Sequence, residues 1–134
     1  MDIKETGRTR VVAAVIKRGE HYFCVRRCRS KYTYISEHWE FPGGKVEQGE
    51  DDKTALEREI KEELDWQITV GDHIVTIDYN YPDFGLKLAA YTCKAPAEDN
   101  FKLLEHTDYC WLTADKLPTL DWTDADAELL KHIK

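Results

Sequence analysis

The segment Gly44–Trp66, GKVEQGEDDKTALEREIKEELDW, constrains the fold of this chain more than any other part of it. Asp51 and Asp52 are residue types that cap helix N-termini, and the run from 54 to 64 contains neither Gly nor Pro. Apolar residues recur there at every fourth position: Leu56, Ile60 and Leu64. This spacing predicts an amphipathic helix whose apolar stripe faces a core.

Three glutamates of this helix share one edge. At about 100° of rotation per residue, Glu59, Glu62 and Glu63 lie beside the apolar stripe, while the basic residues Arg58 and Lys61 point elsewhere. Clustered like charges destabilise a helix, so three carboxylates near a core need a compensating cation, and oxygen ligands favour Mg²⁺ or Mn²⁺. The alternative for the helix alone is a solvated face in which the glutamates pair with the basic residues.

A strand and a turn precede the helix. WEFPGG, which spans Trp39–Gly44, is typical of a short strand that ends in a Pro-Gly-Gly turn. Glu50 and the pair Arg58 and Glu59 follow at fixed intervals. The turn, the loop and the helix therefore form one extended motif.

This motif resembles the signature of the Nudix hydrolase family, G-x5-E-x7-R-E-U-x-E-E-x-G-U, in which U is aliphatic. The matching residues are Gly44, Glu50, Arg58, Glu59, Ile60, Glu62 and Glu63. From average composition, such a set of matches arises by chance on the order of once in a million chains of this length. Asp65 stands where the last Gly belongs, and Trp66 where an aliphatic residue is usual. We expect Asp65 to end the helix in the left-handed conformation.

The resemblance implies a role for each residue of the motif. The family's metal ligands correspond to Glu59, Glu62, Glu63 and the carbonyl oxygen of Gly43. The metal is expected to be Mg²⁺, with Mn²⁺ as a substitute. Gly44, Glu50 and Arg58 correspond to residues that support the metal site by holding the loop against the helix.

The resemblance also implies a proton acceptor and a phosphate-binding group. Glu62, Glu59 and Glu105 are candidate acceptors, and Glu62 is preferred because its neighbours on the helix are better placed to bind metal. Glu105 matches a further glutamate of the MutT branch, with an ordinary surface role as its alternative. The family places an arginine at the end of the second strand, where Arg26 is our choice over Arg27; a solvent-facing strand end is the alternative.

Base recognition is expected at the start of the C-terminal helix, where Asp126 stands in place of the Asn of the 8-oxoguanine-specific member. An ionised Asp only accepts hydrogen bonds, which suits the exocyclic amino group of cytosine, adenine or guanine, and a cytosine nucleotide is preferred among these. A protonated Asp126 would restore an oxidised-purine substrate. Helix capping is the alternative role for Asp124 and Asp126. Phe84, in a turn, is expected to stack on the base.

The remaining sequence predicts short strands and one more helix. The strands are expected at 10–17, 21–27, 67–79, 86–94 and 109–112, followed by a helical turn at 113–116. The last helix is expected at 123–133, with Leu129, Leu130 and Ile133 inward. This order predicts an α/β protein: an α/β/α sandwich with a mixed central sheet, which is the Nudix fold.

Composition limits the other possibilities. The 134 residues have 42% hydrophobic content and no linker or repeat, which predicts a single Nudix domain over 1–134. The N-terminus has no signal-peptide core and no apolar run could span a bilayer, so we expect a cytoplasmic protein without membrane contact. Four cysteines without metal-ligand spacing predict free thiols, mostly buried. A net charge of −7 disfavours binding to polymeric nucleic acid.

The sequence therefore predicts an Mg²⁺-dependent nucleoside triphosphate pyrophosphohydrolase that converts an NTP and water into an NMP and pyrophosphate. CTP, dCTP or methylated dCTP is the expected substrate, and the enzyme is expected to act as a monomer or homodimer. An 8-oxo-dGTP hydrolase that cleans the nucleotide pool is the first alternative. A non-catalytic nucleotide-binding regulator is the second, although such domains usually lose carboxylates that are intact in this motif.

Overall fold

The computed structural model describes residues 8–133. The prediction that the N-terminus has no signal-peptide core concerns in part residues 1–7, which lie outside this range. The elements follow along the chain as β1 (Arg8–Arg18), β2 (His21–Arg27), β3 (Trp39–Glu40), β4 (Gly43–Lys45), α1 (Asp52–Leu64), β5 (Thr69–Asn80), β6 (Gly85–Lys94), β7 (His106–Thr113), the 3-10 helix η1 (Ala114–Thr119) and α2 (Asp124–Leu130). The mixed sheet between helices confirms the predicted α/β/α sandwich.

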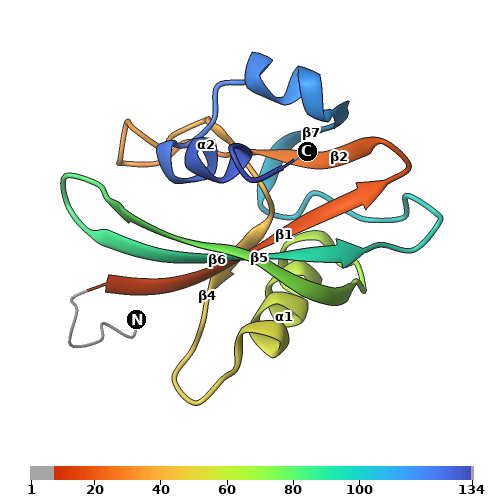
Figure 1. Cartoon of the computed structure of the whole chain (residues 1–134), viewed down its shortest axis with the longest axis horizontal. Coiled ribbons are helices and arrows are strands. Elements are labelled where there is room, and N and C mark those ends of the chain that lie inside the picture. The colour runs from red at the N-terminus through yellow and green to blue at the C-terminus, as the bar shows by residue number, and fades with distance from the viewer. Residues whose placement is uncertain (1–7, 134) are drawn as a thin grey trace.

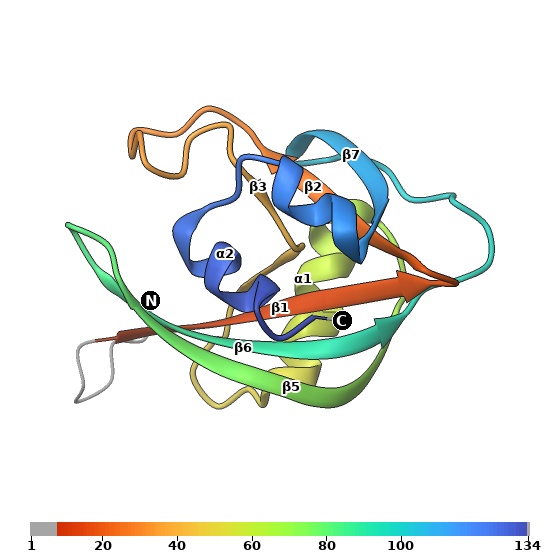
Figure 2. The same ribbon diagram turned by 45° about the horizontal axis from the view of Figure 1, so that its top comes forward.

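Helices cover the two faces of the sheet. Figure 1 shows α1 below the strands and α2 above them, and Figure 2, in which the top is turned forward, shows α2 and η1 in front of the sheet with α1 behind it. Two buried apolar clusters follow from this arrangement. One is built around Leu56, Ile60 and Phe23 under α1, and the other around Leu117 and Leu129 under η1 and α2.

The strand β1 divides the sheet into two arms. One edge of β1 pairs with β6 in parallel from Arg8 to Ile16. Its other edge pairs antiparallel with β4 at Val11–Ala13 and with β2 at Lys17–Arg18. Strands β3 and β7 pair with β2. Because β1 changes partner along its length, the arm formed by β2, β3 and β7 diverges from the arm of β5 and β6, as Figure 2 shows.

The helix α1 has the predicted boundaries and stripe. The Asp51 side chain accepts a hydrogen bond from the Thr54 N–H at 2.8 Å, which caps the first turn. Leu56, Ile60 and Leu64 are fully buried. Asp65 ends the helix at φ 50° and ψ 43°, in the left-handed region. The expected conformation is confirmed, and the carboxylate also accepts from Lys61 Nζ at 2.7 Å.

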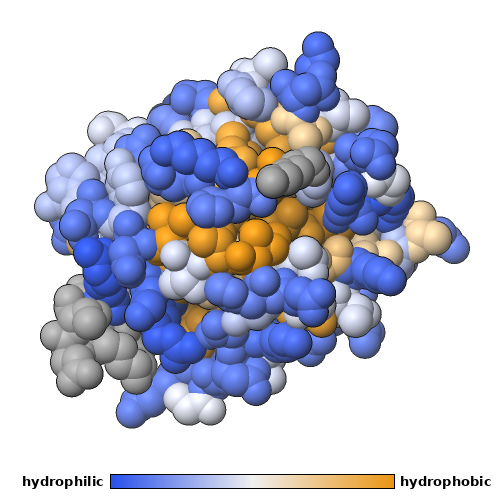
Figure 3. All heavy atoms as spheres, viewed as in Figure 1, coloured by the Kyte–Doolittle hydropathy of each residue, from blue (hydrophilic) through white to orange (hydrophobic). Residues whose placement is uncertain are grey.

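The helix α2 ends earlier than the sequence predicts. It stops at Leu130, where 123–133 was expected, and of the three predicted inward residues only Leu129 is fully buried. Leu130 and Ile133 are half-buried against the same core. Figure 3 shows hydrophobic atoms at the surface in the band between α2 and β5, within an otherwise largely hydrophilic face. A seven-residue helix leaves this side of the core partly open.

Two other predictions need correction. Two glycines that were expected to form a Pro-Gly-Gly turn after a short strand begin a second strand instead, because Trp39–Glu40 pairs with β2 whereas Gly43–Lys45 pairs with β1. Pro42, which has no N–H, lies between them. The last strand begins at His106 and not at Tyr109, since backbone pairing with β2 extends through an exposed polar stretch that carries no apolar signal.

The cysteines agree with the predicted free thiols. All four cysteines are free: Cys24 and Cys93 are buried, Cys110 is half-buried, and Cys28 is exposed. Within residues 8–133, no helix is long and apolar enough to cross a membrane.

Candidate functional site

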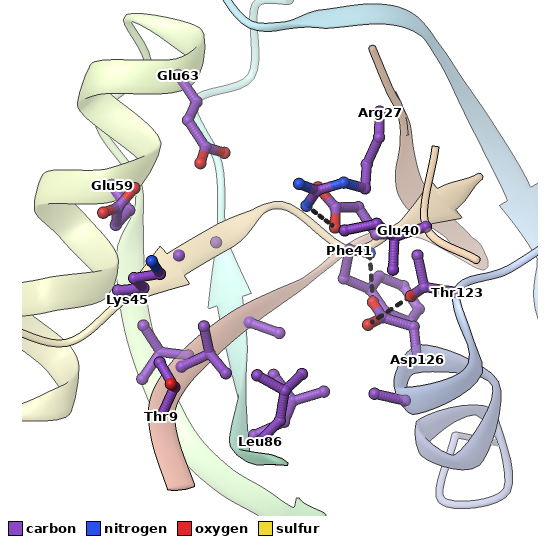
Figure 4. A pocket seen from close by; sticks show the side chains of 18 of the residues that line it. Thr9, Arg27, Glu40, Phe41, Lys45, Glu59, Glu63, Leu86, Thr123 and Asp126 are labelled. Atoms are coloured by element: carbon purple, nitrogen blue, oxygen red, sulfur yellow. Dashed lines mark hydrogen bonds and ion pairs between the residues drawn. The ribbon is translucent and has the colours of Figure 1, made fainter. Parts of the chain in front are cut away.

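A cleft of about 1640 Å³ opens where the two arms of the sheet diverge. Side chains from several segments line it, as Figure 4 shows. Glu59 and Glu63 project into it from α1 on one side, and Asp126 projects from α2 on the other, with Arg27 and Glu40 between them. The cleft therefore has a carboxylate end and a distinct second end.

The carboxylate end concentrates negative charge in a partly dry space. The side chain of Glu63 is only 10% exposed and that of Glu59 only 16%. Burial, followed by the charges of Glu40, Glu59 and Glu105, raises the pKa of Glu63 to about 9. Burial also raises the pKa of Glu59, and the charge of Glu62 raises it further. Both shifts favour the protonated form of these two carboxyl groups.

Glu62, the third glutamate of the motif, does not line the cleft. Its side chain is 53% exposed, and both of its oxygens lie 3.3 Å from Arg58 Nη1. In this arrangement of residues 8–133, no three acidic, His or Cys side chains are close enough together to hold one metal ion. Glu105, by contrast, lines the cleft next to Glu63.

The loop before α1 is tied to the helix by Arg58. Its guanidinium donates to Glu50 twice, from Nε at 2.8 Å and from Nη2 at 3.0 Å, and also donates to the Lys45 carbonyl at 3.0 Å. These bonds lower the pKa of Glu50 to about 2. The predicted contact between Arg58 and Glu50 is present, and Arg58 also donates to Glu59 at 3.1 Å.

Two glycines let the backbone approach its neighbours closely. A Cβ at Gly43 would collide with the carbonyl of Val12 on β1, and a Cβ at Gly44 would collide with the carboxylate of Glu59. The first obstacle is backbone and cannot move, whereas the second is the end of a flexible side chain. Both glycines line the cleft.

The two glycines should therefore respond differently to alanine. We expect Gly43→Ala to lower the free energy of unfolding by about 1–3 kcal/mol, the usual cost of overpacking, because the β1–β4 pairing must shift. Gly44→Ala should leave stability within about 0.5 kcal/mol but lower activity, because Glu59 is displaced. Urea unfolding and turnover of both variants test this. Equal stability losses in the two would contradict it.

Arg26 and Arg27 end β2 and point to different places. Arg26 Nε donates to the carbonyl of Glu37 at 2.8 Å, outside the cleft. Arg27 lines the cleft and lies on the side of β2 that also carries Phe23 and Val25, which pack in the cluster under α1. The structure thus brings Arg27 to the site, and not Arg26 as the sequence interpretation preferred.

Glu40 and His106, which the sequence analysis does not single out, also line the cleft. Arg27 Nη1 donates to Glu40 Oε1 at 3.0 Å, and His106 Nε2 lies 3.1 Å from Glu40 Oε2. The pairing of β2 with β7 slips between Arg26 and Arg27, and this irregularity sets His106 opposite Arg27. Because these partners are far apart in sequence, no local pattern could have identified them.

The second end of the cleft is built around Asp126. Its Oδ2 accepts from the N–H of Phe41 at 2.8 Å, and its Oδ1 accepts from the hydroxyl of Thr123 at 3.1 Å (Figure 4). The residue is only 7% exposed. Burial, followed by the charge of Glu40, raises the pKa of Asp126 to about 7. Asp126 is therefore a cleft residue and not simply an exposed helix cap.

Aromatic residues border this end. Phe84 lines the cleft, and its ring lies 5.6 Å from Tyr32 and 5.3 Å from Tyr81, measured between ring centroids. The hydroxyl of Tyr34 donates to Asp83 at 2.5 Å, which joins the loop after β2 to the hairpin between β5 and β6. The predicted aromatic side chain is thus available at the cleft wall.

The donor atoms at the carboxylate end have the chemistry that a metal cation needs. Oε1 of Glu63 is buried and has no hydrogen-bond partner. The raised pKa of Glu63 reflects its burial first and then the charges of Glu40, Glu59 and Glu105, and a bound divalent cation would favour the ionised carboxylate against both. Oxygen donors alone also match the ligand preference of Mg²⁺ and Mn²⁺.

Comparison with known proteins identifies the class. The NUDIX domain model matches residues 7–133. The chain therefore belongs to the Nudix family, and it is a Nudix hydrolase; this family generally uses divalent metal ions. Among its relatives, a Mycobacterium tuberculosis protein provisionally named 8-oxo-dGTP diphosphatase 2 is 34% identical over 123 residues, which cover 87% of this chain and 81% of the relative.

A second relative carries a different name. The CTP pyrophosphohydrolase of Escherichia coli is 30% identical over 134 residues, covering 90% of this chain and 87% of that protein. Among solved structures, the Escherichia coli ORF135 protein superposes with a TM-score of 0.79 at 28% identity, over 93% of this chain and 87% of that one. These similarities confirm the predicted family and its MutT and CTP pyrophosphohydrolase branch.

Proposed function

We propose that this chain is an Mg²⁺-dependent nucleoside triphosphate pyrophosphohydrolase that releases a nucleoside monophosphate and pyrophosphate. One observation carries the proposal: a single cleft has a carboxylate end, an arginine in its middle and a buried Asp126 at its far end. This order matches the order of phosphates, sugar and base along a nucleotide. The relatives named above as nucleotide hydrolases support the same class of substrate.

The carboxylate end would hold the metal. We assign Glu59, Glu63 and the Gly43 carbonyl to it, together with Glu62, which must first leave Arg58. A bound divalent cation neutralises charge on the phosphate oxygens and makes water more acidic. Glu50 and Arg58 keep the loop with Gly44 against the helix, so the donors stay in register.

The protein groups would then act on the phosphates and the water. Arg27 carries an unchanging positive charge into the cleft and would bind phosphate oxygens. Glu105 and Glu59 line the cleft and are the candidates that could accept the proton of the attacking water as the side chains now stand. Glu62 remains a candidate acceptor only if it rotates away from Arg58, since proton transfer needs hydrogen-bond contact.

Asp126 would determine which nucleobase is bound. As a carboxylate it already accepts two hydrogen bonds, and its remaining lone pairs would accept from an exocyclic amino group, which favours CTP, dCTP or methylated dCTP. The pKa of about 7 favours a second candidate, an 8-oxo-dGTP-type substrate, because a protonated Asp126 also donates. Phe84 would stack on either base.

The test is hydrolysis of common, oxidised and methylated ribo- and deoxynucleoside triphosphates with Mg²⁺, with pyrophosphate and phosphate detected separately. We expect pyrophosphate and a monophosphate, with a cytosine nucleotide preferred. Asp126→Asn should weaken that preference, because the amide adds a donor where a carboxylate only accepted. We expect a shift of roughly tenfold or more, because a hydrogen bond to a charged group contributes about 1.5–3 kcal/mol.

Each other outcome has a definite meaning. Selective turnover of oxidised guanine would replace the cytosine assignment with the second candidate. No turnover of any triphosphate would reject the pyrophosphohydrolase and favour a nucleotide-binding regulator, even though Glu59, Glu62 and Glu63 are all present. A monomer or homodimer in the cytoplasm, where nucleoside triphosphates are abundant, stays our prediction for the setting of this activity.

A further inference from the structure

Glu40 connects side chains from two other strands in the wall between the two ends of the cleft. Its Oε1 accepts from Arg27 on β2 at 3.0 Å, and its Oε2 lies 3.1 Å from Nε2 of His106 on β7. The side chains of Glu40 and His106 are 14% and 5% exposed, so both are largely dry. A carboxylate that is shared and partly desolvated in this way fixes the orientation of both partners.

Unsatisfied polar atoms gather around this group. Within residues 8–133, the buried side-chain polar atoms without a hydrogen-bond partner belong to Arg27, Glu63, His106 and two indoles, those of Trp66 and Trp111. The three that are not indoles all line the cleft. Buried polar atoms are normally satisfied, so their concentration in residues that line one cleft indicates a site held ready for a ligand and not optimised for stability.

The chain contains a second arginine–glutamate pair, outside the cleft, that can be compared with Arg27 and Glu40. Arg26 precedes Arg27, and its Nη2 lies 3.8 Å from Glu37 Oε1, but both of these side chains are more than 40% exposed. Neither Arg26 nor Glu37 lines the cleft. Two neighbouring arginines thus each have a glutamate partner, and only one of the two pairs faces the site.

From this geometry we propose that Glu40 is a positioning residue, which together with His106 holds the guanidinium of Arg27 in the orientation that receives the phosphate chain. The inference rests on the proposed function. Glu40 does not itself contact phosphate, because two like charges would repel. Its effect on the substrate passes through Arg27, which is otherwise a long side chain free to take several rotamers.

A purely structural role for Glu40 predicts something different. If Glu40 served only the fold, its loss would reduce the melting temperature and the fraction of active enzyme, which lowers kcat and leaves KM unchanged. A positioning role raises KM, because Arg27 binds the phosphates less well in both the ground and transition states. It also makes the effect of Glu40 depend on the presence of Arg27.

The experiment compares Glu40→Gln with the matched control Glu37→Gln in the full chain. Arginine Nε–H signals in ¹⁵N-labelled protein report whether the guanidinium is held, and Arg27→Gln identifies the signal of Arg27. We expect Glu40→Gln to speed exchange of this proton with water at least tenfold and to lower kcat/KM for the preferred triphosphate by roughly tenfold, mainly through KM. Glu37→Gln should change neither.

The double variant Glu40→Gln and Arg27→Gln completes the test. We expect it to be no worse than Arg27→Gln alone. An unchanged Arg27 exchange rate in Glu40→Gln, or activity losses that multiply in the double variant, would overturn the proposal. Failure of the pyrophosphohydrolase function is a separate result, namely a wild-type protein that hydrolyses no triphosphate. The exchange measurement needs no substrate and would then decide by itself whether Glu40 positions Arg27.

Discussion

Glu63→Gln should reduce turnover roughly 1000-fold and yet leave the metal-free protein at least as stable as the wild type. The activity loss follows from the proposed role of Glu63 as a metal ligand, because a catalytic metal supplies several kcal/mol of transition-state stabilisation. The stability result follows because Glu63 is buried among Glu40, Glu59 and Glu105. A neutral amide of the same shape removes the cost of burying a carboxylate and its repulsion by those three neighbours.

This prediction includes a pH dependence with a definite sign. The ordinary pKa of Glu63 is 4.5 and the folded protein raises it to about 9, so between these values the folded state holds a proton that the unfolded state has lost. The contribution of Glu63 is therefore most favourable below pH 4.5 and becomes less favourable as pH rises toward 9. The difference in stability between Glu63→Gln and wild type should grow across this interval.

Urea unfolding in a chelator, at several pH values, measures this difference. Glu57→Gln is the matched control, because Glu57 is an exposed residue of the same helix. It should change neither activity nor the pH dependence of stability. If Glu63→Gln unfolds at lower urea than wild type at pH 8 without metal, the repulsion that we infer at the carboxylate end is not present.

Arg27→Gln should lower kcat/KM for the preferred triphosphate by roughly 10- to 150-fold, whereas Arg26→Gln should change it less than twofold. The first range corresponds to the loss of a hydrogen bond to a charged group, about 1.5–3 kcal/mol. The second follows because Arg26 bonds to the carbonyl of Glu37 outside the cleft. Both variants remove one positive charge, so a general electrostatic effect cancels in the comparison.

Steady-state kinetics at two salt concentrations test this pair. Screening weakens distant charges more than contacts, so the Arg27 effect should persist at high salt. A larger loss in Arg26→Gln would restore the residue that the sequence interpretation preferred. Equal losses in both variants would mean that neither arginine contacts the phosphates directly.

The sequence predicts the local elements of this site well. The spacing of Leu56, Ile60 and Leu64 and the cap at Asp51 depend only on residues within a few turns, so α1 and its buried stripe follow directly from the pattern. The contact between Arg58 and Glu50 is also predicted, because the motif spans both residues. Local chemistry determines these features.

Contacts between distant strands were not predictable in the same way. The link from Glu40 to His106 joins residues 66 positions apart, and the irregular pairing that sets His106 opposite Arg27 leaves no sequence signal. To choose between Arg26 and Arg27, one must know which face of β2 is covered by α1. The alternation of side chains along a strand shows which residues share a face, but it does not show which element packs against that face. Glu62 differs from expectation because Arg58 competes for its carboxylate.

The segment from Trp39 to Gly44 has a consequence for how such an enzyme can diversify. At the proposed phosphate side, the segment would act through the Glu40 side chain, and we expect substitution there to be costly. At the proposed base side, it offers Asp126 only a backbone N–H, that of Phe41, which every non-proline residue supplies. New residues at position 126 can therefore be tried by mutation without redesigning the hydrolytic half. Enzymes descended from one ancestor could thus change the nucleobase that they bind and keep the same hydrolysis reaction.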